Sequence, residues 1–219
     1  MHTGPSQPPI PVAARRPGER RRVLVAGVLG AFVVFVAQSL SWLVLGVHDR
    51  TIHELPNGEA IAALLREAAP APGVYHHPGL PLPGESQEAW AARYRTGPVV
   101  PFLAYHPGGA EPFSPVQPLR GWILDVVSAT IVAWMLSLAA PSLPGYAGRV
   151  AFVTLFGAFA ACVSWLSMYN WMSLPVDWTI VMSLELVASW ALAGLVLAWR
   201  IRPDAVTQTG AATRPPLRG

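Results

Sequence analysis

The sequence predicts an all-α membrane protein with four transmembrane helices and a small extracytoplasmic α+β cap between helices 1 and 2. Of its 219 residues, 53% are hydrophobic and only 12% are charged, whereas soluble domains average about a quarter charged residues. Four apolar runs reach the roughly 20 residues that cross a bilayer. The segment between the first two runs, 48–121, is too long for a plain loop, so it is expected to hold structure of its own.

The predicted elements divide the chain into seven parts. Both ends are rich in Pro, Arg or small polar residues, which is typical of disordered segments. The first apolar run is longer than the 7–15 residues of a signal-peptide core, so an uncleaved anchor is expected. The expected parts are a disordered basic cytoplasmic tail (1–22), transmembrane helix 1 (23–47), an extracytoplasmic segment (48–121), transmembrane helices 2 (122–140), 3 (150–168) and 4 (177–200), and a disordered cytoplasmic tail (201–219).

Arginine positions predict the orientation of these helices. The sequence has no lysine, and its 15 basic residues are all arginines. With four spans, most of them fall on one side of the membrane, and positive loops face the cytoplasm. A bacterial inner-membrane protein with both termini in the cytoplasm is therefore expected. The arginines on this side are Arg15, Arg16, Arg20, Arg21, Arg22, Arg149, Arg200, Arg202, Arg214 and Arg218.

The extracytoplasmic segment contains signals for both helices and strands. "LPNGEAIAALLREAAP" predicts a short amphipathic helix that Asn57 caps and Pro70 ends. "PGVYHHPG" and "GPVVPFLAYHPGG" predict short extended pieces that pair as a hairpin, with a further helical turn between them. This cap is expected to rest on the outer ends of the spans.

Two carboxylates fall inside predicted spans. Glu185 lies eight residues beyond Asp177, which places it ~12 Å deeper along a helix, where an ionised acid costs a few kcal/mol. Asp125 is expected near the outer interface. No arginine lies in the spans to pair with Glu185. Either a protonated acid is therefore expected, or one that is bonded across the bundle to Gln38, Ser39, Ser128 or Thr130. Glu185, Asp125 and Gln38 form the candidate binding set, either as a polar cavity or as a structural hydrogen-bond network.

Five histidines in the extracytoplasmic segment are weak candidates for metal ligands. Their spacing does not place them on one helix face or one strand face, and no zinc, hydrolase, P-loop or dinucleotide motif accompanies them. No metal, cofactor or catalytic residue is therefore predicted. The lone Cys162 excludes an intrachain disulfide. The histidines are His48, His53, His76, His77 and His106.

Small residues four apart predict close packing between the spans, since helices in lipid associate through van der Waals contact at small side chains. Pairs of this kind occur in three of the four spans. They are Ala26/Gly30 and Gly27/Ala31, Gly157/Ala161 and Ala160/Ser164, and Gly194/Ala198 and Ser189/Ala193.

Two stretches together carry a resemblance to a known group of proteins. "SWLVLGVHDRTIHELPNGEAIAALLREAAPAPGVYHHPG" and the sequence from Gly145 to Ile201, with its "NW" turn before a proline, resemble small, uncharacterised bacterial four-span inner-membrane proteins. The resemblance implies the topology but no activity and no catalytic residue. The matching positions are Ser41, Trp42, His48, Pro72, Gly73, Tyr75, Asn170, Trp171 and Pro175.

These features favour a non-catalytic structural, accessory or partner-binding subunit of the inner membrane. The alternative is a small transporter or channel-like subunit that uses Glu185 and Asp125. A membrane enzyme or metalloprotein built on the extracytoplasmic histidines is the least favoured class. The expected partner is the lipid bilayer, and a homo-oligomer or a second membrane protein is left open. No nucleic-acid-binding pattern is present.

Overall fold

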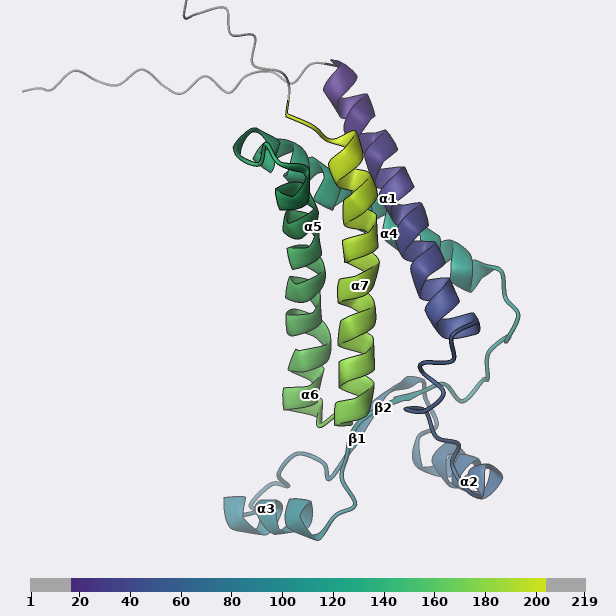
Figure 1. Cartoon of the computed structure of the whole chain (residues 1–219). Helices are drawn as coiled ribbons and strands as arrows, with labels where there is room; N and C mark the ends of the chain where they lie inside the picture. The colour runs from purple at the N-terminus through teal and green to yellow at the C-terminus, as the bar shows by residue number, and fades with distance from the viewer. Residues whose placement is uncertain (1–16, 204–219) are drawn as a thin grey trace, which may run out of the picture.

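The computed structural model describes residues 17–203, and most of these form a bundle of long helices (Figure 1). Within this range, four helical segments are long and apolar enough to cross a membrane, as predicted. They are α1 (Pro17–Leu43), α4 (Val116–Ala139), a third segment in which α5 (Tyr146–Ala161) continues through the π-helical turn η2 (Cys162–Leu166) into α6 (Ser167–Met172), and α7 (Val176–Arg200). A 3-10 turn, η1 (Ala140–Ser142), follows α4.

Three of the four predicted spans have displaced boundaries. α1 begins at Pro17, so residues 17–22 are helical rather than part of a disordered tail, and it ends at Leu43 rather than at residue 47. Proline is favoured at the first helical position, and arginine is a good helix former, so the helix extends past the apolar run. α4 likewise begins at residue 116, and the third segment runs over 146–172. The tails 1–16 and 204–219 lie outside the described residues.

α7 is the centre of the bundle. It packs against α5 on one side and α1 on another, and α1 also packs against α4. Glycines lie at these crossings: a Cβ at Gly27 would lie 2.7 Å from the Cα of Thr130, and one at Gly157 would lie 2.8 Å from the Cβ of Trp190. The small residues therefore bring the backbones together, as their spacing predicts. Leu136 and Leu197 are fully buried in the shared core.

Residues 44–115, which we call the cap segment, hold the remaining elements. These are α2 (Gly58–Ala68), β1 (Gly73–His77), α3 (Gln87–Thr96) and β2 (Val100–Tyr105). β1 and β2 pair antiparallel, with Tyr75 opposite Leu103, so the predicted strand pairing is confirmed. The cap segment lies beyond the end of the bundle where α1 ends and α7 begins, and α2 and α3 stand on either side of the strands (Figure 1). We call this the cap end, and the opposite end the terminal end.

The two helices of the cap segment begin differently. Asn57 is the N-cap residue of α2, as predicted, but it adopts a left-handed conformation (φ 58°) and its side chain makes no capping hydrogen bond. Asparagine tolerates this backbone conformation better than most residues, which explains its presence in the turn. α3 has the side-chain cap instead, because the Ser86 hydroxyl accepts a hydrogen bond of 3.1 Å from the Ala89 N–H.

An ion pair joins α3 to the loop before it. Arg93 donates two hydrogen bonds to the Glu85 carboxylate, of 2.9 and 2.6 Å, and the Trp90 indole donates to the Gly79 carbonyl at 3.0 Å. The hydrogen bonds from Arg93, followed by the one from the Leu82 N–H, hold the pKa of Glu85 below its usual value of 4.5. These contacts order the loop around α3, although α3 itself has no buried residue.

A buried arginine closes the terminal end. Arg149 is predicted as a cytoplasmic loop charge, but its side chain is buried and donates to the carbonyls of Leu143, Pro144 and Ala198, at 3.0, 2.7 and 3.3 Å. The last carbonyls of a helix lack partners within the helix. Arg149 therefore satisfies one carbonyl of α7 and two of the turn that precedes α5.

Candidate functional site

The loop after α1 turns back and buries a histidine beside α7. Gly46 has a positive φ of 58°, a backbone conformation that glycine adopts without strain. His48 follows two residues later and is only 1% exposed. The Thr51 hydroxyl and backbone N–H both donate to the His48 carbonyl at 2.9 Å. The loop thus holds its own backbone in place while the imidazole reaches into the bundle.

The imidazole of His48 joins α1 to α7 through a single nitrogen. Its Nε2 lies 3.1 Å from the Ser41 hydroxyl and 3.4 Å from Oε1 of Glu185. Its Nδ1 is buried and has no hydrogen-bond partner among residues 17–203. In a hydrolase triad the serine and the acid contact opposite nitrogens of the histidine. Here both contact the same nitrogen, so the three residues form a hydrogen-bonded junction and not a nucleophile-activating relay.

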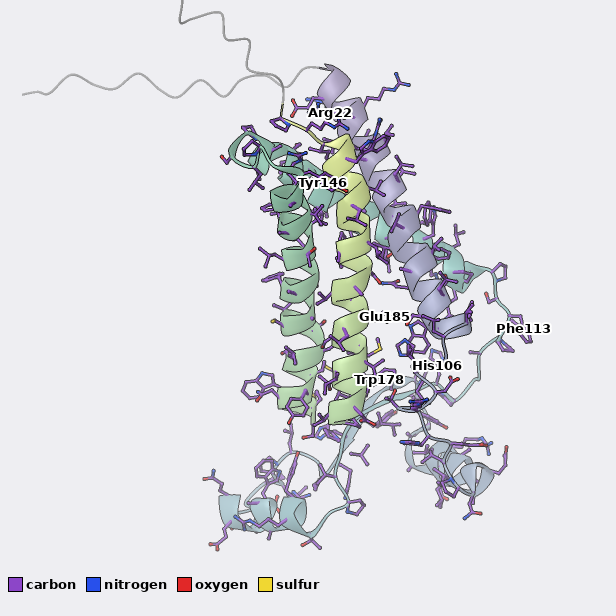
Figure 2. All side chains as sticks on the ribbon, in the orientation of Figure 1. Arg22, His106, Phe113, Tyr146, Trp178 and Glu185 are labelled. Atoms are coloured by element: carbon purple, nitrogen blue, oxygen red, sulfur yellow. The ribbon has the colours of Figure 1, made fainter. Side chains whose placement is uncertain are left out.

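Tryptophan rings enclose this junction. The Trp42 ring stacks on the His48 ring with 3.9 Å between centroids and 11° between planes. Trp178 meets both rings edge-on, with 6.2 Å between centroids in each case. Trp165, which lies in the π-helical turn η2, contacts Trp178 in turn. Figure 2 shows Glu185 and Trp178 on α7 toward the cap end. The imidazole is therefore packed against the face of one indole and beside a second.

The sequence predicts Glu185 to be an acid without a basic partner and His48 to lie in the extracytoplasmic segment. The structure brings them together, and it shows no hydrogen bond between Glu185 and Gln38, Ser39, Ser128 or Thr130 in the described part of the chain. The two residues are 137 positions apart, so spacing does not reveal the pair. The available signal was Gly46, which permits the turn that brings His48 back to the helices.

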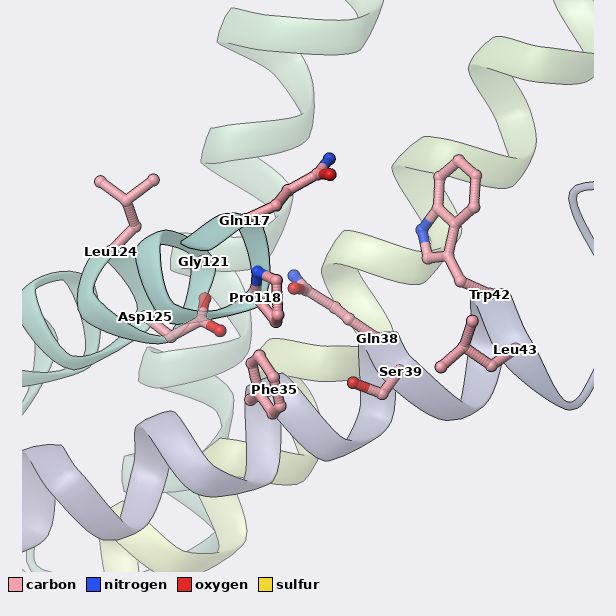
Figure 3. Close-up of a pocket in the computed structure, with 10 residues that line it drawn as sticks. All are labelled: Phe35, Gln38, Ser39, Trp42, Leu43, Gln117, Pro118, Gly121, Leu124 and Asp125. Atoms are coloured by element: carbon pink, nitrogen blue, oxygen red, sulfur yellow. The ribbon is translucent and has the colours of Figure 1, made fainter. Parts of the chain in front are cut away.

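The other two predicted binding residues meet in a pocket between α1 and α4. The pocket has a volume of about 480 Å³, and no residue of the described chain makes a hydrogen bond with the half-buried carboxylate of Asp125. Glu185 does not line it. The structure thus unites Gln38 with Asp125 but separates both from Glu185. The lining residues are Phe35, Gln38, Ser39, Trp42, Leu43, Gln117, Pro118, Gly121, Leu124 and Asp125 (Figure 3).

The remaining histidines are exposed and lie on different parts of the cap segment. His53 precedes α2, His76 and His77 are on β1, and His106 follows β2. Within residues 17–203, no three His, Cys, Asp or Glu side chains are grouped so that they could hold a metal ion. His48, the one buried histidine among residues 17–203, instead contacts Ser41 and Glu185.

No family model, curated protein or solved structure matches the chain. Its class therefore follows from its own geometry. Four helices that are each long and apolar enough to cross a bilayer are compatible with a multi-pass membrane protein, with polar residues concentrated at a histidine–glutamate junction and in a pocket beside Asp125.

Proposed function

We propose that the protein is a non-catalytic, multi-pass protein of the bacterial inner membrane that serves as a structural or partner-binding subunit. The observation that carries this proposal is the cap segment, which forms two helices and a strand pair but buries only His48, Ala69 and Pro78 among its residues. Neither α2 nor α3 contains a buried residue. Short helices in water depend on packing of an apolar face for their stability, so these helices favour a surface supplied by another molecule.

The apolar face of α2 indicates where such a surface would bind. Ile61, Leu64, Leu65 and Ala68 lie at helical spacing on one side of the helix. Leu64, at one edge of this face, is 66% exposed, whereas Ile61 and Leu65 are partly buried. Glu59 and Arg66 lie on the opposite side. This face fits an apolar surface of a second membrane protein or of a second copy of the chain.

The contact that Glu185 makes within the bundle also supports a structural role. Glu185 contacts His48, which comes from the loop between α1 and α2. An acid used in this way joins two segments of the fold. In the proposed orientation both termini are cytoplasmic and the cap segment is periplasmic, because Arg149 and Arg200 belong to the terminal end of the bundle.

The proposal is tested by native mass measurement of the full chain extracted in mild detergent from its own membrane. A complex larger than one chain is expected. Leu64→Gln is expected to release the partner, whereas Ala63→Gln, on another side of the same helix, keeps it. A single-chain particle for the wild-type protein, or equal complexes for both variants, would contradict the proposal.

A second function, as a small transporter or channel-like subunit, is favoured by one observation. The pocket between α1 and α4 presents Asp125 together with Gln38 and Gln117, a set of oxygen-bearing side chains suited to a cation or a small polar solute. Purified protein in vesicles would then take up a monovalent cation faster than empty vesicles. Asp125→Asn would abolish the difference, and Glu59→Gln, a neutralised acid in the cap segment, would leave it unchanged.

A further inference from the structure

Three arginines border one cavity at the terminal end of the bundle. Arg21 and Arg22 come from the beginning of α1, and Arg200 is the last residue of α7. With Gly18 and Val25 they line a space of about 540 Å³. Figure 2 shows Arg22 at this end, far from the cap segment. Because α7 supplies the third guanidinium, the cluster is a product of the fold and not only of the arginine run.

Two of the three guanidinium groups have no hydrogen-bond acceptor in the described part of the chain. The side chains of Arg21 and Arg200 make no hydrogen bond to any group in residues 17–203, and Nε of Arg200 is buried without an acceptor. The guanidinium of Arg200 instead lies 5.5 Å from the centre of the Trp199 ring. In the described parts of the two helix ends, the only carboxylate is that of Glu19.

The helix ends add to the preference for an anion. The first N–H groups of α1 carry a partial positive charge that favours anions. The carbonyl end of α7 carries the opposite partial charge, but Arg149 already donates to the Ala198 carbonyl there. Guanidinium groups therefore outnumber carboxylates around the cavity, and the forked donors of Arg21 and Arg200 match the oxygens of a phosphate group.

The surroundings of the cavity favour a phospholipid as the molecule that carries the phosphate group. Val25 lines its wall, and Leu24 and Val28 are exposed on the next turns of α1, so apolar surface begins directly beside the charges. A basic site followed by apolar helix surface matches the order of headgroup and acyl chains in a phospholipid. We infer that Arg21, Arg22 and Arg200 bind the phosphate of an anionic phospholipid, whose chains lie along α1. This inference rests on the chain spanning a membrane and is independent of the partner-binding role.

Native mass spectrometry of the full chain in detergent tests the inference by titration with phosphatidylglycerol. Each positive charge near anionic headgroups contributes about 1 kcal/mol, which corresponds to about a fivefold change in affinity. Arg200→Gln is thus expected to weaken binding about fivefold, and the triple Gln variant at 21, 22 and 200 about 100-fold. Arg95→Gln, an exposed arginine of α3, is the matched control and is expected to change nothing.

Two further ligands distinguish the sources of the phosphate. Phosphatidylcholine, which has no net charge, is expected to bind more weakly than phosphatidylglycerol, and inorganic phosphate is expected to compete poorly because it lacks acyl chains. Equal affinity of the triple variant and the control, equal binding of the two lipids, or equally tight binding of inorganic phosphate would overturn the inference. If the triple variant does not fold, as judged by circular dichroism, Arg200→Gln alone decides the test, because that side chain makes no hydrogen bond in the described chain.

Discussion

Replacing His48 with alanine tests whether the histidine–glutamate junction stabilises the bundle. The substitution removes the ring stacked on Trp42, worth about 1 kcal/mol beyond its buried area, and the contacts of Nε2 with Ser41 and Glu185, each worth about 1 kcal/mol. It also leaves Glu185 without a partner. We therefore expect the free energy of unfolding to fall by about 3 kcal/mol.

The assay is thermal or denaturant unfolding of purified protein in detergent, followed by circular dichroism. His53→Ala is the matched control, because His53 is exposed and lies in the same loop. Its effect is expected to stay within about 0.5 kcal/mol. Glu185→Gln retains an oxygen that can accept a hydrogen bond from Nε2 of His48, so its cost is expected to be below about 1 kcal/mol.

A double-mutant cycle isolates the pair itself. His48→Ala and Glu185→Ala are combined, and the double variant is expected to be at least about 1 kcal/mol more stable than the sum of the two single effects predicts. Additive effects would show that the 3.4 Å contact contributes nothing. If His48→Ala lowers the free energy of unfolding no more than His53→Ala does, the junction does not stabilise the bundle.

Three further contacts are tested by substitution. Gly27→Ala is expected to destabilise the fold by about 1–3 kcal/mol through a clash with α4, whereas Gly121→Ala, with open space around its Cβ, is expected to be neutral or stabilising in the same unfolding assay. Arg149→Gln is expected to cost about 3 kcal/mol, because carbonyls at the terminal end lose a charged donor. Arg93→Gln is expected to raise the pKa of Glu85 toward 4.5 in a carbon-13 titration of the carboxyl group. In the wild-type protein the stability from this pair is present above pH 4.5 and is lost as the pH falls through the lower folded-state pKa; an unchanged titration would contradict the assignment.

The helices were predictable because their signal is local. A run of about 20 apolar residues identifies a candidate span without knowledge of what it packs against, and the glycines at 27 and 157 lie at helix crossings as their spacing predicts. The ends were less predictable, because Pro17 and the following arginines continue the helix beyond the apolar run. Hydropathy identifies the residues that can enter the lipid. Helix propensity determines how far the helix continues beyond those residues.

The candidate sites were predictable only in part, because side-chain partners in a bundle depend on the crossings. Gln38 and Asp125 were both identified as polar residues of the spans, and the α1–α4 crossing places them in one pocket. His48 was assigned to the exterior because it follows the apolar run. Its burial depends on a backbone turn at Gly46 and on the tryptophans that receive the ring, and neither feature has a periodic signature.

α7 contributes residues to both the histidine–glutamate junction and the arginine cluster. It carries Glu185 toward the cap end and Arg200 at the terminal end, and it packs against both α5 and α1. Arg21 lies near the start of α1, and His48 lies in the loop that follows its end. A rotation or sliding of α1 against α7 would therefore separate His48 from Glu185 and move Arg21 away from Arg200 together, because packed helices shift as rigid elements. The histidine–glutamate contact and a phosphate bound between the arginines would both oppose that movement, so each would stabilise the arrangement on which the other depends.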